Sequence, residues 1–307
     1  MSDINRRTFT TAAAMTLTGT AALAATPRRT VIKAFASRHV EARDIEVWVP
    51  PVEPGQRLRV LYAHDGQNLF DGASSYSGVS WELDKAMTRL AAGGVEPAII
   101  VAIANSPARA REYQAGGALA FFDAATADAI RRSCGGELLS DAYLRFIVEE
   151  LKPHIDARFP TRTGADATFT MGASMGGLVS LEALRAHPQV FGGAGCLSAH
   201  TLLFAPGAAN DPNLRPPANA GDQIEAGLRA YAAQAFPAPD GHRLWIDRGS
   251  EELDALYGRS QDAFIDGLRQ RGYTQGRHLE ARVFERTGHH ERWWAARAET
   301  VLRFLLA

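Results

Sequence analysis

The chain has 307 residues, 46% of them hydrophobic, which is enough to bury the core of one large α/β domain. Its formal net charge is −1 at pH 7, and the sequence contains no block of Lys and Arg residues. This balance argues against nucleic acid and anionic membrane surfaces as partners.

The N-terminus has the pattern of an export signal. Asn5-Arg6-Arg7-Thr8-Phe9 precedes an uncharged, weakly apolar stretch from Thr10 to Ala25, which includes small residues suited to a peptidase. The pattern resembles a twin-arginine signal, although Asn5 replaces the usual Ser or Thr, and the alternative is a disordered basic terminus. The stretch is too short and too weakly apolar for stable membrane insertion. We therefore expect residues 1–25 to direct export to the periplasm or the medium, and residues 26–307 to form a single domain.

Strand-like and helix-like runs alternate over most of the remaining chain. Apolar runs predict strands at residues 30–37, 45–50, 57–63, 98–104, 168–173, 189–197, 243–247 and 278–285. Amphipathic or helix-favouring runs predict helices at residues 81–92, 141–159 (with Ser140 as N-cap), 178–187, 222–234, 260–271 and 291–306. The first two strands are expected to pair antiparallel. The alternation implies an α/β fold, with a mainly parallel central sheet and helices on both faces.

Residues 106–138 interrupt this alternation. They contain Arg109, Arg111 and Glu112, and then Gly/Ala-rich sequence with Phe121 and Phe122, without steady periodicity. A loop this long inside a compact domain is usually functional. We therefore predict a lid or a pocket insertion here.

The sequence Gly172-Ala173-Ser174-Met175-Gly176 has the pattern G-x-S-x-G, and it stands between a predicted strand and a predicted helix. A sharp strand-to-helix turn exposes the Ser hydroxyl, and flanking glycines relieve crowding of the backbone. The pattern alone is weak, because small residues meet by chance in a glycine-rich chain. Its position predicts that Ser174 is a nucleophile.

A serine nucleophile needs a base, and the base needs an orienting acid. In sheets of this kind these partners follow the serine in the order acid, then His, each on a loop after a strand. Here His289 and His290 follow the last strand, and acidic residues follow the strand before it. The candidate acids are Asp247, Glu251, Glu252 and Asp254.

An oxyanion hole requires two N–H donors, one from the elbow and one from the loop after an earlier strand. Met175 follows the serine, and His64-Asp65-Gly66-Gln67 occupies the earlier loop. The backbone N–H groups of Gln67 and Met175 are therefore the predicted donors. The alternative for Asp65-Gly66 is a simple turn.

These residues carry a resemblance to the putative esterase family, which includes esterase D, enterochelin esterases, feruloyl esterases and mycolyltransferases. The matching segments are Leu61–Asp71, Arg111–Tyr113, Tyr143–Pro153, Gly172–Leu178, Gly195–Ser198, and His289–Glu291 with Trp294 and Arg297. The resemblance implies an α/β-hydrolase fold and hydrolysis of acyl esters without a cofactor. It matches His289 to the base. It also favours Asp254 as the acid, with Glu252 as the alternative.

The substrate pocket is expected to include Asp65, Trp81 and Arg111. Trp81 and the Phe121-Phe122 pair are candidates for an acyl pocket, and Arg109 and Arg111 for binding an anionic group. The alternative for Arg111 is a salt bridge with Glu112. No set of His, Cys and carboxylate residues has metal-ligand spacing, so no metal is expected.

The sequence therefore predicts an exported serine esterase that acts on a small-molecule or glycan acyl ester. Two alternatives use the same fold. One is an acyltransferase, in which an alcohol replaces water, and the other is a binding protein that has lost catalysis.

Export gives a first testable prediction. Replacing both Arg6 and Arg7 by Lys should keep the protein in the cytoplasm, because the twin-arginine route reads the Arg pair itself. Fractionation of cells that produce the wild type and the variant would measure this. Unchanged recovery of a cleaved protein from the periplasm would contradict it.

Overall fold

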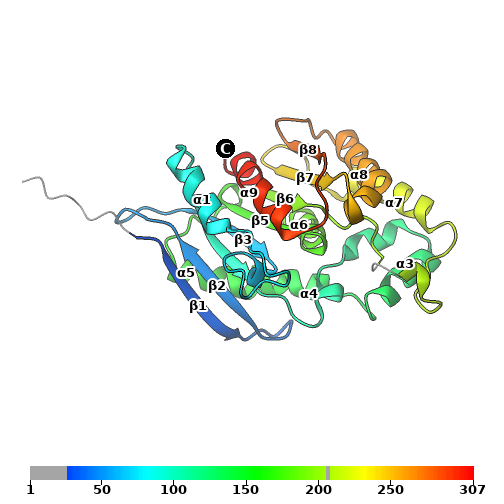
Figure 1. Ribbon diagram of the computed structural model, residues 1–307, viewed down its shortest axis with the longest axis horizontal. Coiled ribbons are helices and arrows are strands. Elements are labelled where there is room, and N and C mark those ends of the chain that lie inside the picture. Colours follow the sequence, from blue (N-terminus) through cyan, green and yellow to red (C-terminus); the bar gives the residue numbers. More distant parts are fainter. Residues whose placement is uncertain (1–25, 205–207) are drawn as a thin grey trace, which may run out of the picture.

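The strands form a single sheet (Figure 1). The structure is a computed structural model that describes residues 26–204 and 208–307, so the predicted export signal at 1–25 lies outside the described residues. The strand order in the described part is β1-β2-β4-β3-β5-β6-β7-β8. The strands are β1 (Arg28–Phe35), β2 (Arg43–Val49), β3 (Arg59–His64), β4 (Ala98–Ile103), β5 (Thr168–Ala173), β6 (Gly193–Leu197), β7 (Arg243–Gly249) and β8 (Leu279–Phe284). Strand β2 runs antiparallel to β1 and β4, and the later neighbours are parallel, which confirms the predicted fold class.

Helices cover both faces of this sheet (Figure 1). The longer helices are α1 (Leu83–Ala92), α3 (Ala124–Ser133), α4 (Ser140–Arg145), α5 (Lys152–Arg158), α6 (Met175–Ala186), α7 (Ala220–Ala235), α8 (Gly258–Gln270) and α9 (Glu291–Leu306), with α2 (Arg109–Glu112) a single turn. Helices α1 and α9 lie together on one face, and α5 and α6 pack on the other. Within residues 26–204 and 208–307, no helix has the length and apolar character needed to cross a bilayer.

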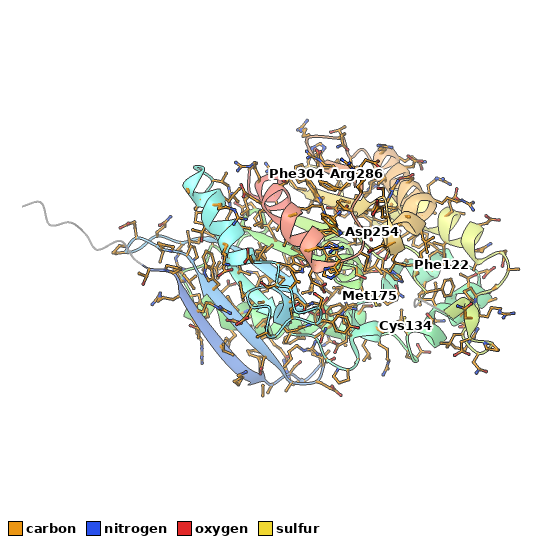
Figure 2. All side chains as sticks on the ribbon, viewed as in Figure 1. Phe122, Cys134, Met175, Asp254, Arg286 and Phe304 are labelled. Carbon is orange, nitrogen blue, oxygen red and sulfur yellow. The ribbon has the colours of Figure 1, made fainter. Side chains whose placement is uncertain are left out.

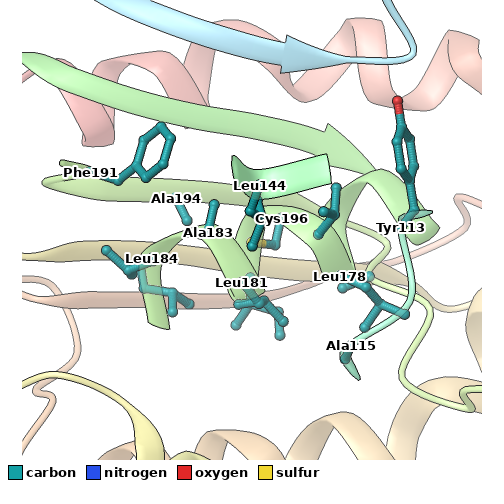
Figure 3. Close-up of a cluster of buried hydrophobic side chains, with 14 of the residues drawn as sticks. Tyr113, Ala115, Leu144, Leu178, Leu181, Ala183, Leu184, Phe191, Ala194 and Cys196 are labelled. Carbon is teal, nitrogen blue, oxygen red and sulfur yellow. The ribbon is translucent and has the colours of Figure 1, made fainter. Parts of the chain in front are cut away.

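Successive side chains of a strand point to opposite faces of the sheet, so the hydrophobic core is divided into two clusters, one on each face. In β3, Val60 and Tyr62 join the cluster under α5 and α6, whereas Leu61 and Ala63 join the cluster under α1 and α9. Figure 3 shows the first cluster, where leucines of α6 pack over Ala194 and Cys196 of β6. Side chains buried on both faces explain why the central strands have continuous apolar sequences.

The long helix expected at residues 141–159 is present, but it is not a regular α-helix. A π-helical stretch, η3 (Phe146–Leu151), lies between α4 and α5. The predicted N-cap is also wrong by one residue: Leu139 precedes the helix, and Ser140 is its first residue. Ser140 is buried instead, close to where a side chain at Gly116 would lie.

Residues 106–138 are more regular than predicted. They form α2, the 3-10 helix η2 (Gly116–Phe121) and α3, and the side chain of Asp123 caps α3 by accepting the Thr126 N–H at 2.8 Å. The Phe pair faces α7 and does not line an acyl pocket. Phe121 makes an edge-to-face contact with Tyr231 of α7, and Phe122 packs against Gly227 of α7. Figure 2 labels Phe122.

A buried ion pair fixes the start of this segment. Arg43 of β2 donates two hydrogen bonds to Glu112, of 2.9 and 2.7 Å, and both side chains are 1% exposed. The sequence suggested Arg111 as the partner of Glu112, which is wrong. Arg111 instead donates to the carbonyl oxygen of Glu137. The pair ties α2 to the sheet next to the loop that follows β4.

Removing one member of this pair should be costly, because it leaves a buried charge without its partner. We expect Glu112→Ala to lower the free energy of unfolding by about 3–5 kcal/mol. Glu149→Ala is the matched control, because the half-exposed Glu149 carboxylate pairs with Arg145 and His39, and its loss should have a much smaller effect. Denaturant unfolding of both variants measures the difference. Equal losses would show that the Arg43–Glu112 pair does not anchor the segment.

Candidate active site

Ser174 occupies a strained turn between β5 and α6. Its backbone angles, φ 56° and ψ −124°, are rarely adopted by a residue with a side chain. The turn is held from both sides, because the Ser174 N–H donates to Leu197 and the Ser174 carbonyl oxygen accepts from the N–H of His200, at 2.9 and 3.1 Å. The strain places the hydroxyl at the carboxyl edge of the sheet.

Gly172 makes this turn sterically possible. A Cβ atom at Gly172 would lie 2.5 Å from the carbonyl carbon of Gly176, closer than any real contact. At Gly176, a Cβ atom would reach 3.4 Å from a carboxylate oxygen of Asp65. The first glycine of the motif therefore allows the strand and helix to approach each other, and the second leaves space beside the loop after β3.

His289 and Asp254 meet at the same edge of the sheet. The Nδ1 atom of His289 is 2.6 Å from a carboxylate oxygen of Asp254, and the Asp254 side chain is fully buried. Burial alone would raise the pKa of Asp254, but hydrogen bonds from His289, the Ser198 hydroxyl and the Gly249 N–H lower it below its usual value. Asp254 is therefore an ionised acceptor that fixes the imidazole ring.

The other candidate acids lie elsewhere. Glu252 accepts the backbone N–H of His289 at 3.1 Å, and its carboxylate packs against Gly288, so it holds the loop and not the ring. Glu251 is exposed. Asp247 is fully buried at the end of β7 and bonds the Ser198 N–H and the Trp245 indole. Only Asp254 of these four contacts the imidazole in the described part of the chain.

Ser198 was missed as a functional residue, although its segment carried the resemblance. It follows β6 with a positive φ of 43°, and its hydroxyl donates to Asp254 at 2.5 Å. The same oxygen accepts from Trp294 Nε1 and from Arg297, at 3.0 and 2.9 Å. Trp294 also meets the His289 ring edge-on, with centroids 5.0 Å apart. Ser198 therefore connects the acid to α9.

The two predicted oxyanion donors lie at the starts of helical turns. Met175 is the first residue of α6, and Gln67 is the second residue of the 3-10 helix η1 (Gly66–Asn68), so neither N–H has an acceptor within its own helix. The side chain of Gln67 accepts the Asn105 N–H at 3.2 Å, which joins the loops after β3 and β4. A Cβ atom at Gly66 would lie 2.6 Å from the backbone of Ala102, which explains the glycine there.

Asp65 and Arg109 form an ion pair beside these loops. Arg109 donates two hydrogen bonds to the Asp65 carboxylate, at 2.8 and 2.7 Å, and Asn105 adds a third at 2.7 Å. Burial would raise the pKa of Asp65, but the Arg109 pair outweighs it and lowers this pKa. Arg109 lines the cavity next to Ser174, whereas Arg111 does not, so the prediction of Arg111 as a pocket residue is wrong.

Ser174 and His289 open into a common cavity of about 840 Å³. Its walls come from the loops after β3, β4 and β8, and they combine polar and aromatic side chains: Asp65, Gln67, Asn68, Ser74, Tyr76, Ser77, Trp81, Asn105, Arg109, Ala173, Ser174, His289, His290, Glu291 and Trp294. Trp81 lies in the wall, and the centroid of its ring is 5.8 Å from that of Trp294. His290 caps α9, with its Nδ1 accepting the Arg292 N–H, and so it is not placed as a second base.

No cluster of His, Cys, Asp and Glu in residues 26–204 and 208–307 is arranged to hold a metal ion. His64, which precedes the oxyanion loop, is buried between the Tyr143 and Thr170 hydroxyls at 2.9 and 3.0 Å. Burial lowers the pKa of His64 to about 3, so the ring is neutral and supports the loop structurally.

The family model described as "Putative esterase" matches residues 38–305 of the chain. No curated protein sequence matches. Among solved structures, a ferulic acid esterase has a TM-score of 0.61 at 18% identity, over 92% of this chain and 98% of that one. An enterobactin esterase from Shigella flexneri has a TM-score of 0.63 at 18% identity, over 92% of this chain, which spans 60% of that longer protein. An IroE-like serine hydrolase from Shewanella oneidensis has a TM-score of 0.60 at 19% identity, over 90% and 79%. At these identities the likeness shows the fold alone.

Proposed function

Because the chain belongs to the putative esterase family, and with it to the carboxylic ester hydrolases, we propose that it is a serine esterase with an acyl-enzyme intermediate. One observation carries the proposal. Ser174, on its strained turn, shares a cavity with a His289 ring that is fixed by the buried Asp254 carboxylate at 2.6 Å. A nucleophile, a base and an orienting acid in this arrangement are the parts that acyl transfer needs.

The first half of the reaction forms the acyl-enzyme. Ser174 Oγ attacks the ester carbonyl carbon, its proton passes to His289 Nε2, and the carbonyl electrons move onto oxygen. The N–H groups of Gln67 and Met175 stabilise this oxyanion. When the carbonyl re-forms, the bond to the alcohol breaks, and His289 returns the proton to the leaving alkoxide.

Water completes the second half. His289 takes a proton from water, the hydroxide attacks the acyl carbon, and the oxyanion forms again in the same hole. Collapse of this intermediate breaks the bond to Ser174 Oγ, which recovers its proton from the imidazolium. The carboxylic acid leaves, and His289 is again neutral with Nδ1–H directed at Asp254.

The cavity supports an acyl ester of moderate size as substrate, either a small molecule or a sugar-linked ester. Trp81 and Trp294 offer an apolar wall, while Asn68, Ser77 and Glu291 offer hydrogen bonds. Similar solved proteins are named for a ferulic acid ester and for enterobactin. We propose that the enzyme meets such a substrate outside the cytoplasm, on the basis of the Arg6-Arg7 signal pattern.

Covalent labelling tests the mechanism. A fluorophosphonate should label the wild type at Ser174, while Ser174→Ala should not react and His289→Ala should react slowly. Both variants should lose several orders of magnitude in kcat on a chromogenic acyl ester, on the order of 10⁴-fold or more. His290→Ala is the matched control, because His290 lies in the same cavity wall but its Nδ1 caps α9, and the variant should stay near wild type. An inactive His290→Ala beside an active His289→Ala would reverse the assignment of the base.

The acid assignment gives a further prediction. Asp254→Asn should lower kcat by about 10⁴-fold, because an amide no longer fixes the imidazole tautomer. Glu252→Gln should have a much smaller effect, since an amide oxygen still accepts the His289 N–H. Circular dichroism checks that both variants fold. An inactive Glu252→Gln with an active Asp254→Asn would transfer the role of the acid to Glu252.

A further inference from the structure

Tyr257 lies at the junction of three side chains of the site, although the mechanism above gives it no role. It is the last residue of the 3-10 helix η6 (Glu252–Tyr257), directly after the acid loop, and it has no exposed surface. Its hydroxyl oxygen is 2.9 Å from His200 Nδ1 and 3.5 Å from His289 Nδ1, and the side chain of Ser174 lies beside it.

The direction of these hydrogen bonds follows from His200. Its Nε2 is 2.7 Å from the carbonyl oxygen of Phe204, which can only accept, so Nε2 carries the hydrogen. Burial lowers the pKa of His200 to about 4, so the ring is neutral at pH 7 and Nδ1 is an acceptor. Burial also raises the pKa of Tyr257, which keeps its proton. Tyr257 therefore donates to His200, away from the reacting groups.

Toward Ser174 and His289, the hydroxyl of Tyr257 can therefore act only as a hydrogen-bond acceptor. Because the Tyr257 hydrogen is directed at His200, the only group that this hydroxyl can offer to the neighbouring Ser174 O–H is an acceptor oxygen. When His289 takes the serine proton, the ring becomes positive while its Nδ1–H faces the Asp254 carboxylate and, 3.5 Å away, the Tyr257 oxygen. An oxygen lone pair fixed beside this partly buried positive charge stabilises it.

His200 is also tied to the nucleophile through the backbone. Its N–H donates to the carbonyl oxygen of Ser174 at 3.1 Å. Its ring and that of Tyr257 meet edge-on with centroids 5.6 Å apart, and Tyr257 meets His289 edge-on at 5.9 Å. The pair is thus packed rigidly against both reacting residues.

We propose that Tyr257 is a positioning residue whose hydroxyl, held in one orientation by His200, orients Ser174 before attack and the His289 ring during it. The proposal rests on the proposed serine esterase function. Tyr257 does not line the cavity, so it acts through Ser174 and His289 and not on the substrate.

The decisive variant is Tyr257→Phe, which removes one oxygen and keeps the ring. We expect kcat on a chromogenic acyl ester, and the rate of fluorophosphonate labelling, to fall about threefold to tenfold, as for loss of one buried hydrogen bond. KM should stay within about twofold, because the cavity wall is unchanged. Tyr273→Phe is the matched control: the Tyr273 hydroxyl is buried without a hydrogen-bond partner in the described residues, and its loss should leave both rates at the wild-type level.

His200→Leu tests the same orientation without changing Tyr257, and it also serves if Tyr257→Phe fails to fold. It should lower kcat with KM nearly constant. The double variant should be no slower than about twice the worse single variant, because His200 acts through the Tyr257 hydroxyl. Independent, multiplicative losses would overturn the proposal.

The labelling experiment separates this inference from the function on which it rests. A wild type that does not react at Ser174 would remove the serine mechanism itself. A wild type that reacts, beside a folded Tyr257→Phe that reacts equally fast or faster, would leave the esterase standing and overturn the role of Tyr257. Thermal unfolding measured on the same samples establishes that each variant is folded.

Discussion

The site depends on one buried carboxylate. Asp254 receives short hydrogen bonds from three separate parts of the chain: the His289 ring, the Ser198 hydroxyl and the Gly249 N–H, at 2.6, 2.5 and 2.6 Å. A buried charge is costly unless it is fully hydrogen-bonded, so the fold must bring these donors together. The ends of β6 and β7 and the loop before α9 meet at this carboxylate. The position of the imidazole therefore follows from the need of the buried Asp254 carboxylate for hydrogen-bond donors.

The opposite wall of the cavity is fixed by a second set of charges. The Arg109–Asp65 pair closes the loop after β3 against the loop after β4, and the buried Arg43–Glu112 pair anchors the segment that carries Arg109. Gln67 lies on this wall, while Ser174 directly follows β5, the strand next to β3. An oxyanion hole gains its effect from donors that are fixed before the reaction. The Arg109–Asp65 pair supplies that rigidity in the cavity wall itself, and the Arg43–Glu112 pair supplies it from behind the wall.

The features that could be predicted from the sequence are those that depend on residues close together in the chain. Apolar runs predict the strands, and G-x-S-x-G predicts the turn at Ser174. The motif is informative because any side chain at Gly172 would clash with the backbone of Gly176, which is nearby in the sequence. The partner of Glu112 was not predictable, because it lies 69 residues away at Arg43, and a neighbouring arginine looked equally suitable. Residues 106–138 read as a loop because Gly and Ala dominate the segment and large apolar side chains are few. Tertiary contacts decide such segments, and local propensity does not.

The two buried aspartates near the end of β7 show how environment separates similar groups. Asp247 accepts the Ser198 N–H and the Trp245 indole and pairs with Arg297 at 3.1 Å, yet burial raises its pKa. Hydrogen bonds lower that of Asp254 instead. A carboxylate that orients a histidine must stay ionised while the ring gains and loses a proton, which suits Asp254. Ser198 links the two aspartates, because its N–H donates to Asp247 and its hydroxyl donates to Asp254. The positive φ of Ser198 therefore helps to fix the positions of both carboxylates.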